Sequence, residues 1–137
     1  MFYVATGLLF DKAGKLLIYL RDDKPTISFP NHWDLFGGMV EQGETPQQAL
    51  VREVQEEIGV TLNGFTLFKQ YYSGSEQIGQ NIKYVYYASI DQYAADLKLL
   101  DVGQRIAGID LGERHNYRFA NILATIIDDF ANANVGV

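Results

Sequence analysis

The segment GGMVEQGETPQQALVREVQEEIGV constrains the fold more than any other part of the chain, because it carries a full set of helix signals. Thr45 is a favourable N-cap, Pro46 suits the first helical position, and Gln48 completes a capping box. Gly59 suits the left-handed position just past a helix end. These signals predict a helix from Pro46 to Ile58, about three and a half turns long.

One face of this predicted helix is apolar and the opposite face is charged. At about 100° per residue, the apolar arc is wide enough to dock on a sheet. It consists of Leu50, Val51, Val54 and Ile58. The charged face consists of Arg52, Glu53, Glu56 and Glu57. Ala49 lies among the charged residues, and its small side chain is expected to leave room for a ligand.

The charged face is unfavourable for the helix on its own. Glu53 forms like-charge pairs with Glu56 and Glu57, at about 0.2–0.5 kcal/mol each when exposed. All three carboxylates lie near the negative end of the helix dipole, which costs up to ~1 kcal/mol more. A solvated polar face is the alternative, although such faces tend to alternate in sign. Clustered carboxylates are also the hard oxygen ligands that Mg²⁺ or Mn²⁺ prefers, so the pattern indicates a metal site.

The rest of the chain predicts strands around two helices. Strands are expected over residues 2–10 and 16–20, a short extended piece over 33–36, and a hairpin with arms 65–73 and 80–90. An amphipathic helix is expected over residues 118–133, with an apolar stripe of Ile122, Leu123, Ile126, Ile127 and Phe130. Residues 92–114 have a mixed pattern that gives no assignment. The chain is therefore expected to form one α/β (α+β) domain, residues 1–137, with helices against a sheet.

Composition excludes several classes of function. A chain of 137 residues with 47% hydrophobic and 20% charged residues is typical of a globular domain. The formal net charge of −6 disfavours binding to a nucleic-acid polymer. The absence of cysteine excludes disulfides, zinc–thiolate sites and cysteine nucleophiles. The apolar start of the chain is shorter than a membrane span and has no basic leader, so we expect a cytoplasmic protein without membrane contact.

The charged helix also completes a known family signature. The Nudix box requires a Gly, five residues, a Glu, seven residues, and then Arg-Glu-aliphatic-any-Glu-Glu-any-Gly-aliphatic. The chain matches every required position from Gly38 to Val60, with Glu44 as the first glutamate and Arg52 opening the second half. On these residues the chain resembles the Nudix hydrolases, and its compact length resembles the small MutT-like members.

The resemblance implies a fold, a reaction and a set of roles. The fold would be an α-β-α sandwich with a central mixed sheet. The reaction would be hydrolysis of a diphosphate bond in a nucleoside diphosphate linked to another moiety, with Mg²⁺ or Mn²⁺ as cofactor. The carboxylates of the box and the carbonyl of Gly37 would hold metal, and one carboxylate, Glu53 above all, would instead deprotonate water. Arg52 would orient the glutamates, and Glu44 would be an outer metal ligand or a partner for Arg52.

A few residues outside the box are weaker candidates for the same site. Arg21 follows a strand near the expected cleft and is a candidate for binding a substrate phosphate, with an ordinary surface arginine as the alternative. Asn121 resembles a residue that reads a purine base in the MutT branch, although a polar residue early in a helix needs no such role. Trp33 is expected to pack rather than to stack on a base. Phe36 replaces the usual proline before the two glycines, which predicts a local backbone difference.

An additional carboxylate at the metal is also considered. Some relatives supply one from a later loop, which the segment LDVGQ resembles, but the corresponding position is Val102. Asp101 beside it and Glu76 in the predicted hairpin loop are the candidates. A solvated surface charge is the favoured interpretation of both.

Three hypotheses about function follow. The leading one is a metal-dependent hydrolase acting on a small nucleotide-like diphosphate, such as a nucleoside triphosphate, an oxidised nucleotide or a nucleotide sugar. The second is a non-catalytic Nudix-fold domain that senses a nucleotide, and such domains usually lack some of the box glutamates. The third is an interaction scaffold in which the box is coincidental. The resemblance leaves room for a homodimer, and the substrate is not determined by the box.

Overall fold

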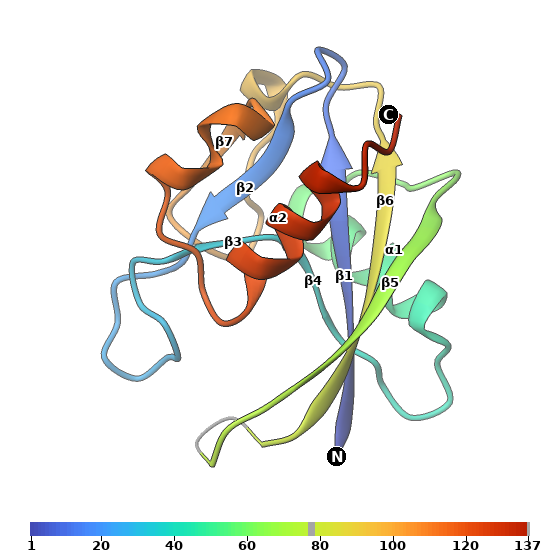
Figure 1. Ribbon diagram of the computed structural model, residues 1–137, viewed down its shortest axis with the longest axis vertical. Helices are drawn as coiled ribbons and strands as arrows, with labels where there is room; N and C mark the ends of the chain where they lie inside the picture. Colours follow the sequence, from blue (N-terminus) through green and yellow to red (C-terminus); the bar gives the residue numbers. More distant parts are fainter. Residues whose placement is uncertain (77–78, 137) are drawn as a thin grey trace.

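The computed structural model describes residues 1–76 and 79–136, which form a mixed sheet with helices on both sides (Figure 1). The strands are β1 (Phe2–Phe10), β2 (Leu16–Leu20), β3 (Trp33–Asp34), β4 (Phe36–Met39), β5 (Thr66–Ser73), β6 (Asn81–Ser89) and β7 (Arg105–Ile109). The α-helices are α1 (Pro46–Ile58) and α2 (Leu123–Asn132), and the short 3₁₀ helices are η1 (Ala94–Asp96) and η2 (Leu111–Asn116).

Strand β1 is the centre of the sheet. It runs parallel to β6 along its whole length and antiparallel to β2 and β4 on its other edge. The order β3-β2-β1-β6-β5, with β4 on β1 and β7 on β2, makes a seven-stranded mixed sheet in the described chain. The predicted hairpin is present as the antiparallel pair β5 and β6. Two residues of its predicted loop, Gln77 and Ile78, lie outside the described residues.

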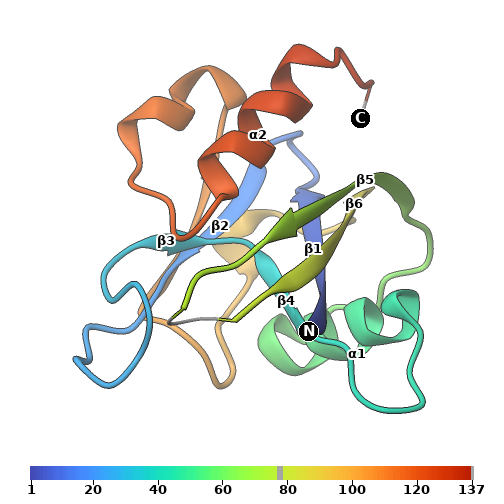
Figure 2. The ribbon, with the colours of Figure 1, turned by 60° about the horizontal axis from the view of Figure 1, so that its bottom comes forward.

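The two α-helices cover opposite faces of this sheet (Figure 2). Successive residues of β1 point to alternate faces, so the strand contributes to both cores. Leu9 belongs to the cluster under α1, and Leu8 and Phe10 belong to the cluster under α2. The predicted α-β-α sandwich is confirmed.

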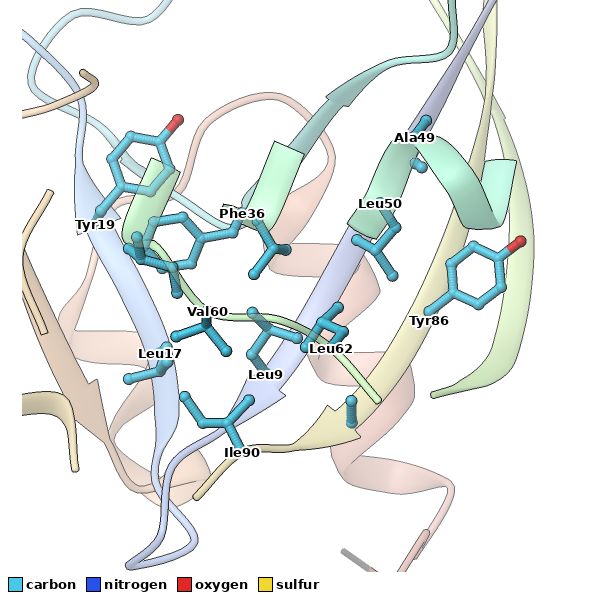
Figure 3. Close-up of a cluster of buried hydrophobic side chains, with 14 residues drawn as sticks. Leu9, Leu17, Tyr19, Phe36, Ala49, Leu50, Val60, Leu62, Tyr86 and Ile90 are labelled. Atoms are coloured by element: carbon cyan, nitrogen blue, oxygen red, sulfur yellow. The ribbon is translucent and has the colours of Figure 1, made fainter. Parts of the chain in front are cut away.

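Helix α1 has the boundaries that the capping signals predict. Thr45 Oγ1 accepts a hydrogen bond from Gln48 N–H at 3.1 Å, and Gln48 Oε1 accepts one from Thr45 N–H at 2.9 Å. Gly59 ends the helix in the left-handed conformation, with φ of 70°. Ala49 is a correction, because it is fully buried with Leu50 in the apolar cluster that Figure 3 shows. It therefore leaves no open space for a ligand, since the helix lies close enough to the sheet to bury a wider arc than the sequence indicates.

The chain changes partner strand at Leu35, and this places the first glycines of the box. Strand β3 pairs with β2, and β4 pairs with β1, so the extended piece predicted over 33–36 is divided in two. Gly37 and Gly38 lie opposite Thr6 and Ala5 of β1. The box loop thus starts inside the sheet, beneath the C-terminal part of α1.

The C-terminal helix begins later than predicted. Trp33 N–H donates to the carbonyl of Arg118 at 2.8 Å, and Ala120 N–H donates to the carbonyl of Trp33 at 2.9 Å. This pairing keeps residues 118–120 extended, and Asn121 then adopts a left-handed φ of 53°. Asn121 therefore precedes α2 rather than lying early in it. The expected apolar stripe is otherwise present, with Leu123, Ile126, Ile127 and Phe130 buried.

The unassigned stretch 92–114 contains strand β7, which pairs with β2 in the antiparallel sense. Across residues 1–76 and 79–136, no helix combines the length and the apolar character needed to cross a lipid bilayer.

Candidate active site

The charged end of α1 packs against the backbone of β4. Gly37 N–H donates a hydrogen bond to Glu57 Oε1 at 2.9 Å. A Cβ added to Gly38 would lie 2.4 Å from Glu53 Cδ, far inside contact distance, and Gly37 has a φ of +141° that disfavours any side chain. Gly38 is therefore needed for the carboxylate of Glu53 to approach the strand, and Gly37 for the close pairing of β4 with β1, where its added Cβ would lie 2.0 Å from the carbonyl oxygen of Ala5.

These carboxylates are not a solvated surface. Glu57 is only 8% exposed, and burial raises the pKa of its carboxyl to about 8, although the hydrogen bond from Gly37 opposes the shift. Burial also raises the pKa of Glu53, against the opposing effect of Arg52. Both shifts show that the anionic forms lack sufficient compensating charge. Glu56, by contrast, has a largely exposed side chain.

Arg52 connects the glutamates of the box. Its guanidinium contacts both carboxylate oxygens of Glu44, at 2.7 and 3.1 Å, and Glu53 Oε1 at 2.8 Å. It also donates to the carbonyl of Met39 at 3.0 Å, and Nη1 lies 3.4 Å from Glu56 Oε2. The pKa of Glu44 is lowered, chiefly by its hydrogen bond from Arg52. The structure thus forms the ion pairs expected of Arg52, and Glu44 lies where it can fix the guanidinium.

The donor set fits a hard divalent cation. In the described part of the chain, no group of three or more His, Cys, Asp or Glu side chains is arranged so that it could hold a metal ion. However, Glu57 accepts a hydrogen bond from Gly37, Glu53 lies against Gly38, and burial raises the pKa of both carboxyl groups. A nearby cation would favour their ionised forms. Carboxylate and carbonyl oxygens are the ligands that Mg²⁺ and Mn²⁺ prefer.

A cavity of about 240 Å³ opens beside this site. Gly37 and Gly38 line it, so that β4 separates the glutamates on one side from the cavity on the other. The other lining residues come from β1, β2, the loop between β2 and β3, β3 and the residue after it, β6, and the start of α2 with the segment before it. They are Val4, Thr6, Tyr19, Arg21, Ser28, Phe29, Asp34, Leu35, Lys83, Ala120, Asn121 and Leu123.

Two of the predicted binding residues, Arg21 and Asn121, are in this wall. Arg21 forms an ion pair with Asp34 at 2.7 Å and donates to the carbonyl of Ser28 at 2.9 Å, so its guanidinium is held in place before any substrate binds. Asn121 reaches the wall because of its left-handed backbone rather than through a helical position.

The remaining predicted residues are placed elsewhere. Trp33 packs edge to face on Tyr117, with ring centroids 5.3 Å apart. Phe36 is fully buried and stacks on Tyr19, with ring centroids 4.9 Å apart. Figure 3 shows the two rings next to each other. Glu76 and Asp101 are exposed and are not part of the cavity wall described above. Leu100, next to Asp101, donates its N–H to the carbonyl of Glu57, so that this loop touches the end of α1.

Sequence reasoning missed Lys83, which is 6% exposed and lines the cavity. The signal was present, because Lys83 is a charged residue within the apolar and aromatic strand NIKYVYYAS. Tyr19 and Asp34 were missed as well, and their hydroxyl and carboxylate lie 3.3 Å apart beside Arg21.

Relatives of known description match the part of the chain that carries the box. A proteobacterial protein described as 8-oxo-dGTP diphosphatase, from Escherichia coli (strain K12), is 37% identical over 67 residues, which are 49% of this chain and 50% of that protein. A second protein of the same description, from Proteus vulgaris, is 40% identical over 65 residues, or 47% of this chain and 56% of that protein. The chain spans about half the length of the curated relatives it matches.

Solved structures share the whole fold at low identity. The MutT protein from Methanosarcina mazei Go1 superimposes with a TM-score of 0.84 at 20% identity, covering 98% of this chain and 96% of that one. The NUDIX domain of Shewanella oneidensis NrtR, complexed with ADP ribose, gives a TM-score of 0.79 at 16% identity, covering 97% and 88%. A family model described as NUDIX domain matches residues 2–108. Since this match includes most of the chain, the chain belongs to the NUDIX domain family, of which it is a MutT-like member.

Proposed function

We propose that this chain hydrolyses a diphosphate bond in a nucleoside diphosphate linked to another moiety, with Mg²⁺ or Mn²⁺ as cofactor. One observation carries the proposal. The strand that holds Glu53 and Glu57, through Gly38 and Gly37, also forms a wall of the cavity. The proposal places the nucleoside in the cavity and its phosphates around this shared strand, at the carboxylates.

Each residue of the box has a role in this proposal. Glu53, Glu56, Glu57 and the carbonyl of Gly37 hold the metal. When bound, the metal neutralises phosphate oxygens and lowers the pKa of coordinated water. Glu53 is the group that accepts a proton from the attacking water, since its raised pKa makes it a better base than an ordinary carboxylate.

The two residues beside Glu53 position it. Arg52 holds Glu53 Oε1 at 2.8 Å, and Glu44 holds Arg52 through two hydrogen bonds. The carboxylate of Glu53 is thereby kept on the side of α1 that faces β4. On the cavity side, Arg21 binds a substrate phosphate and Asn121 contacts the base.

The substrate class is a small nucleotide. Two of the relatives are described as 8-oxo-dGTP diphosphatase, which favours an oxidised or ordinary purine nucleoside triphosphate. A net charge of −6 makes a nucleic-acid polymer an unfavourable partner. Because all the glutamates of the box are present, hydrolysis is favoured over the alternative of a nucleotide-sensing domain without catalysis.

A substrate panel tests the proposal. Purified protein is incubated with nucleoside triphosphates, 8-oxo-dGTP, nucleotide sugars and ADP-ribose, each with Mg²⁺ and with Mn²⁺, and the products are separated by chromatography. We expect a nucleoside monophosphate from at least one substrate and no product in the presence of a chelator. Tight binding of a nucleotide without turnover in either metal would instead support the sensing function.

A further inference from the structure

The cavity contains a buried cation that the proposed hydrolysis does not use. Lys83 lies on β6, paired with Val4 of β1, and its side chain is 6% exposed. Burial lowers the pKa of its ammonium group, with Asp34 acting in the opposite direction. A lysine in such a place is unfavourable unless something compensates for its loss of water.

Among residues 1–76 and 79–136, the compensation for this buried ammonium group is incomplete. Lys83 Nζ donates to Asn81 Oδ1 at 3.0 Å, and the same oxygen accepts from Ser73 Oγ at 3.1 Å. Asn81 is itself fully buried, so this row of polar groups fixes the direction of the ammonium group. An ammonium group has three N–H donors, and Asn81 accepts only one of them.

The other cation in the cavity wall is in a different state. Arg21 has an ion pair with Asp34 at 2.7 Å. Within residues 1–76 and 79–136, Lys83 has no carboxylate within 4.0 Å. Lys83 therefore keeps spare donors for whatever enters the cavity.

We propose that Lys83 determines substrate selectivity by donating a hydrogen bond to an oxygen acceptor on the nucleobase, so that oxo-substituted bases are preferred to amino-substituted ones. The proposal rests on the proposed function for the placement of the phosphates. Strands β4 and β6 flank β1, so their backbones are about 10 Å apart. A nucleoside whose phosphates lie at β4 can bridge this separation and bring its base to Lys83.

The discrimination follows from the chemistry of the ammonium group. It can only donate, so it pairs with a carbonyl oxygen, whereas an exocyclic amino group presents a second donor and leaves the lysine unpaired. A hydrogen bond to a charged group that is lost in a buried site corresponds to roughly 10- to 100-fold in affinity. Deoxyinosine and deoxyadenosine monophosphates are a suitable pair, because they differ only in the 6-oxo group and N1–H of the first and the 6-amino group and unprotonated N1 of the second.

The experiment measures binding of these two monophosphates by titration calorimetry without metal. We expect the wild-type protein to bind the 6-oxo nucleotide roughly 10- to 100-fold more tightly. Lys83→Met keeps the length of the side chain and should reduce the affinity for the 6-oxo nucleotide to that for the 6-amino one. Lys69→Met, which removes an exposed lysine from the neighbouring strand β5, is the matched control and should keep the preference.

Three outcomes would overturn the proposal. They are equal affinity of the wild-type protein for both nucleotides, failure of the 6-oxo nucleotide to bind at millimolar concentration, and a preference that survives in Lys83→Met. The first two need no variant, so the proposal stays testable if Lys83→Met does not fold. A purely structural lysine would change the melting temperature without changing the ratio of affinities. Since monophosphates are not hydrolysed, loss of the preference and absence of diphosphate hydrolysis are separate results.

Discussion

The two sides of β4 are built in different ways. On one side, α1 and the two glycines gather the box residues, and every contact among them comes from the continuous segment 37–57. On the other side, the cavity wall takes residues from β1, β2, the loop before β3, β6 and the entry to α2. The proposed reaction centre is thus formed by one local segment, and the proposed binding cavity is formed by long-range packing. A family can therefore keep the box residues while the residues of the cavity wall change. For this reason the box predicts a reaction but no substrate.

The largest effect is expected from removing a carboxylate on the box side. Glu53→Gln keeps the shape of the side chain and the contact with Arg52 but removes the base. We expect kcat to fall by roughly 10²- to 10⁴-fold, while nucleotide monophosphates bind as before. Steady-state kinetics and calorimetry measure the two sides separately. Asp91→Asn, an exposed neutralisation, is the control, and full activity in Glu53→Gln would show that the box side is not the reaction centre.

A second prediction concerns the close approach between β4 and α1. Gly38→Ala adds a Cβ that would lie 2.4 Å from Glu53 Cδ, so the carboxylate must move. Since a displacement of about 1 Å can cost 10²-fold, we expect a loss of that order in kcat/KM. Gly64→Ala is the matched control, because no heavy atom lies within 4 Å of its added Cβ.

The two variants should have similar effects on the cavity. The Cβ added in Gly38→Ala points toward Glu53 and not into the cavity, so both variants are expected to leave the binding of monophosphates nearly unchanged. Unchanged activity in Gly38→Ala, with the fold confirmed by circular dichroism, would contradict the assigned contact.

A third prediction tests whether Arg52 acts only through the carboxylates. Arg52→Lys keeps the charge but loses the planar fork that contacts both oxygens of Glu44 and also Glu53. We expect kcat to fall about tenfold, which corresponds to roughly 1.4 kcal/mol, with KM unchanged. A change confined to KM would place Arg52 on the substrate side instead, and kinetics over a range of substrate concentrations would show it.

The difference between the two sides also explains what the sequence could predict. Helix α1 was predicted to the residue, because Thr45, Gln48 and Gly59 act on neighbours within the same turn. The start of α2 was predicted too early, because residues 118–120 are held extended by Trp33, far away in the sequence. Strand β7 was not assigned for the same reason, since its partner is β2. Local signals were reliable, and tertiary contacts overrode the rest.

The site shows the same division at the level of side chains. The ion pairs of Arg52 were predicted from the box, and they are formed. The burial of Ala49 and the accessibility of Lys83 to the cavity depend on how closely two elements pack, which no spacing rule contains. A charged residue inside a strand of apolar and aromatic residues was a further signal for the cavity, beside the predicted Arg21 and Asn121.

The smallest expected effect concerns stability and not activity. Glu57 has a pKa of about 8 in the folded chain against 4.5 for the ordinary carboxyl, so the folded state binds more protons than the unfolded state between these values. Folding stability from this group is therefore present at low pH and is lost as the pH rises from about 4.5 to 8.

The variant Glu57→Gln tests this pH dependence, because its side chain cannot ionise and can still accept a hydrogen bond from Gly37 N–H. In a chelator at pH 8, it should melt at a temperature roughly 4–12 °C higher, for a gain of about 1–3 kcal/mol, and at pH 5 it should match the wild type. Adding Mg²⁺ should raise the melting temperature of the wild type but not of the variant. In chelator at pH 8, a lower melting temperature for the variant would show that the chain itself already stabilises the ionised carboxylate of Glu57.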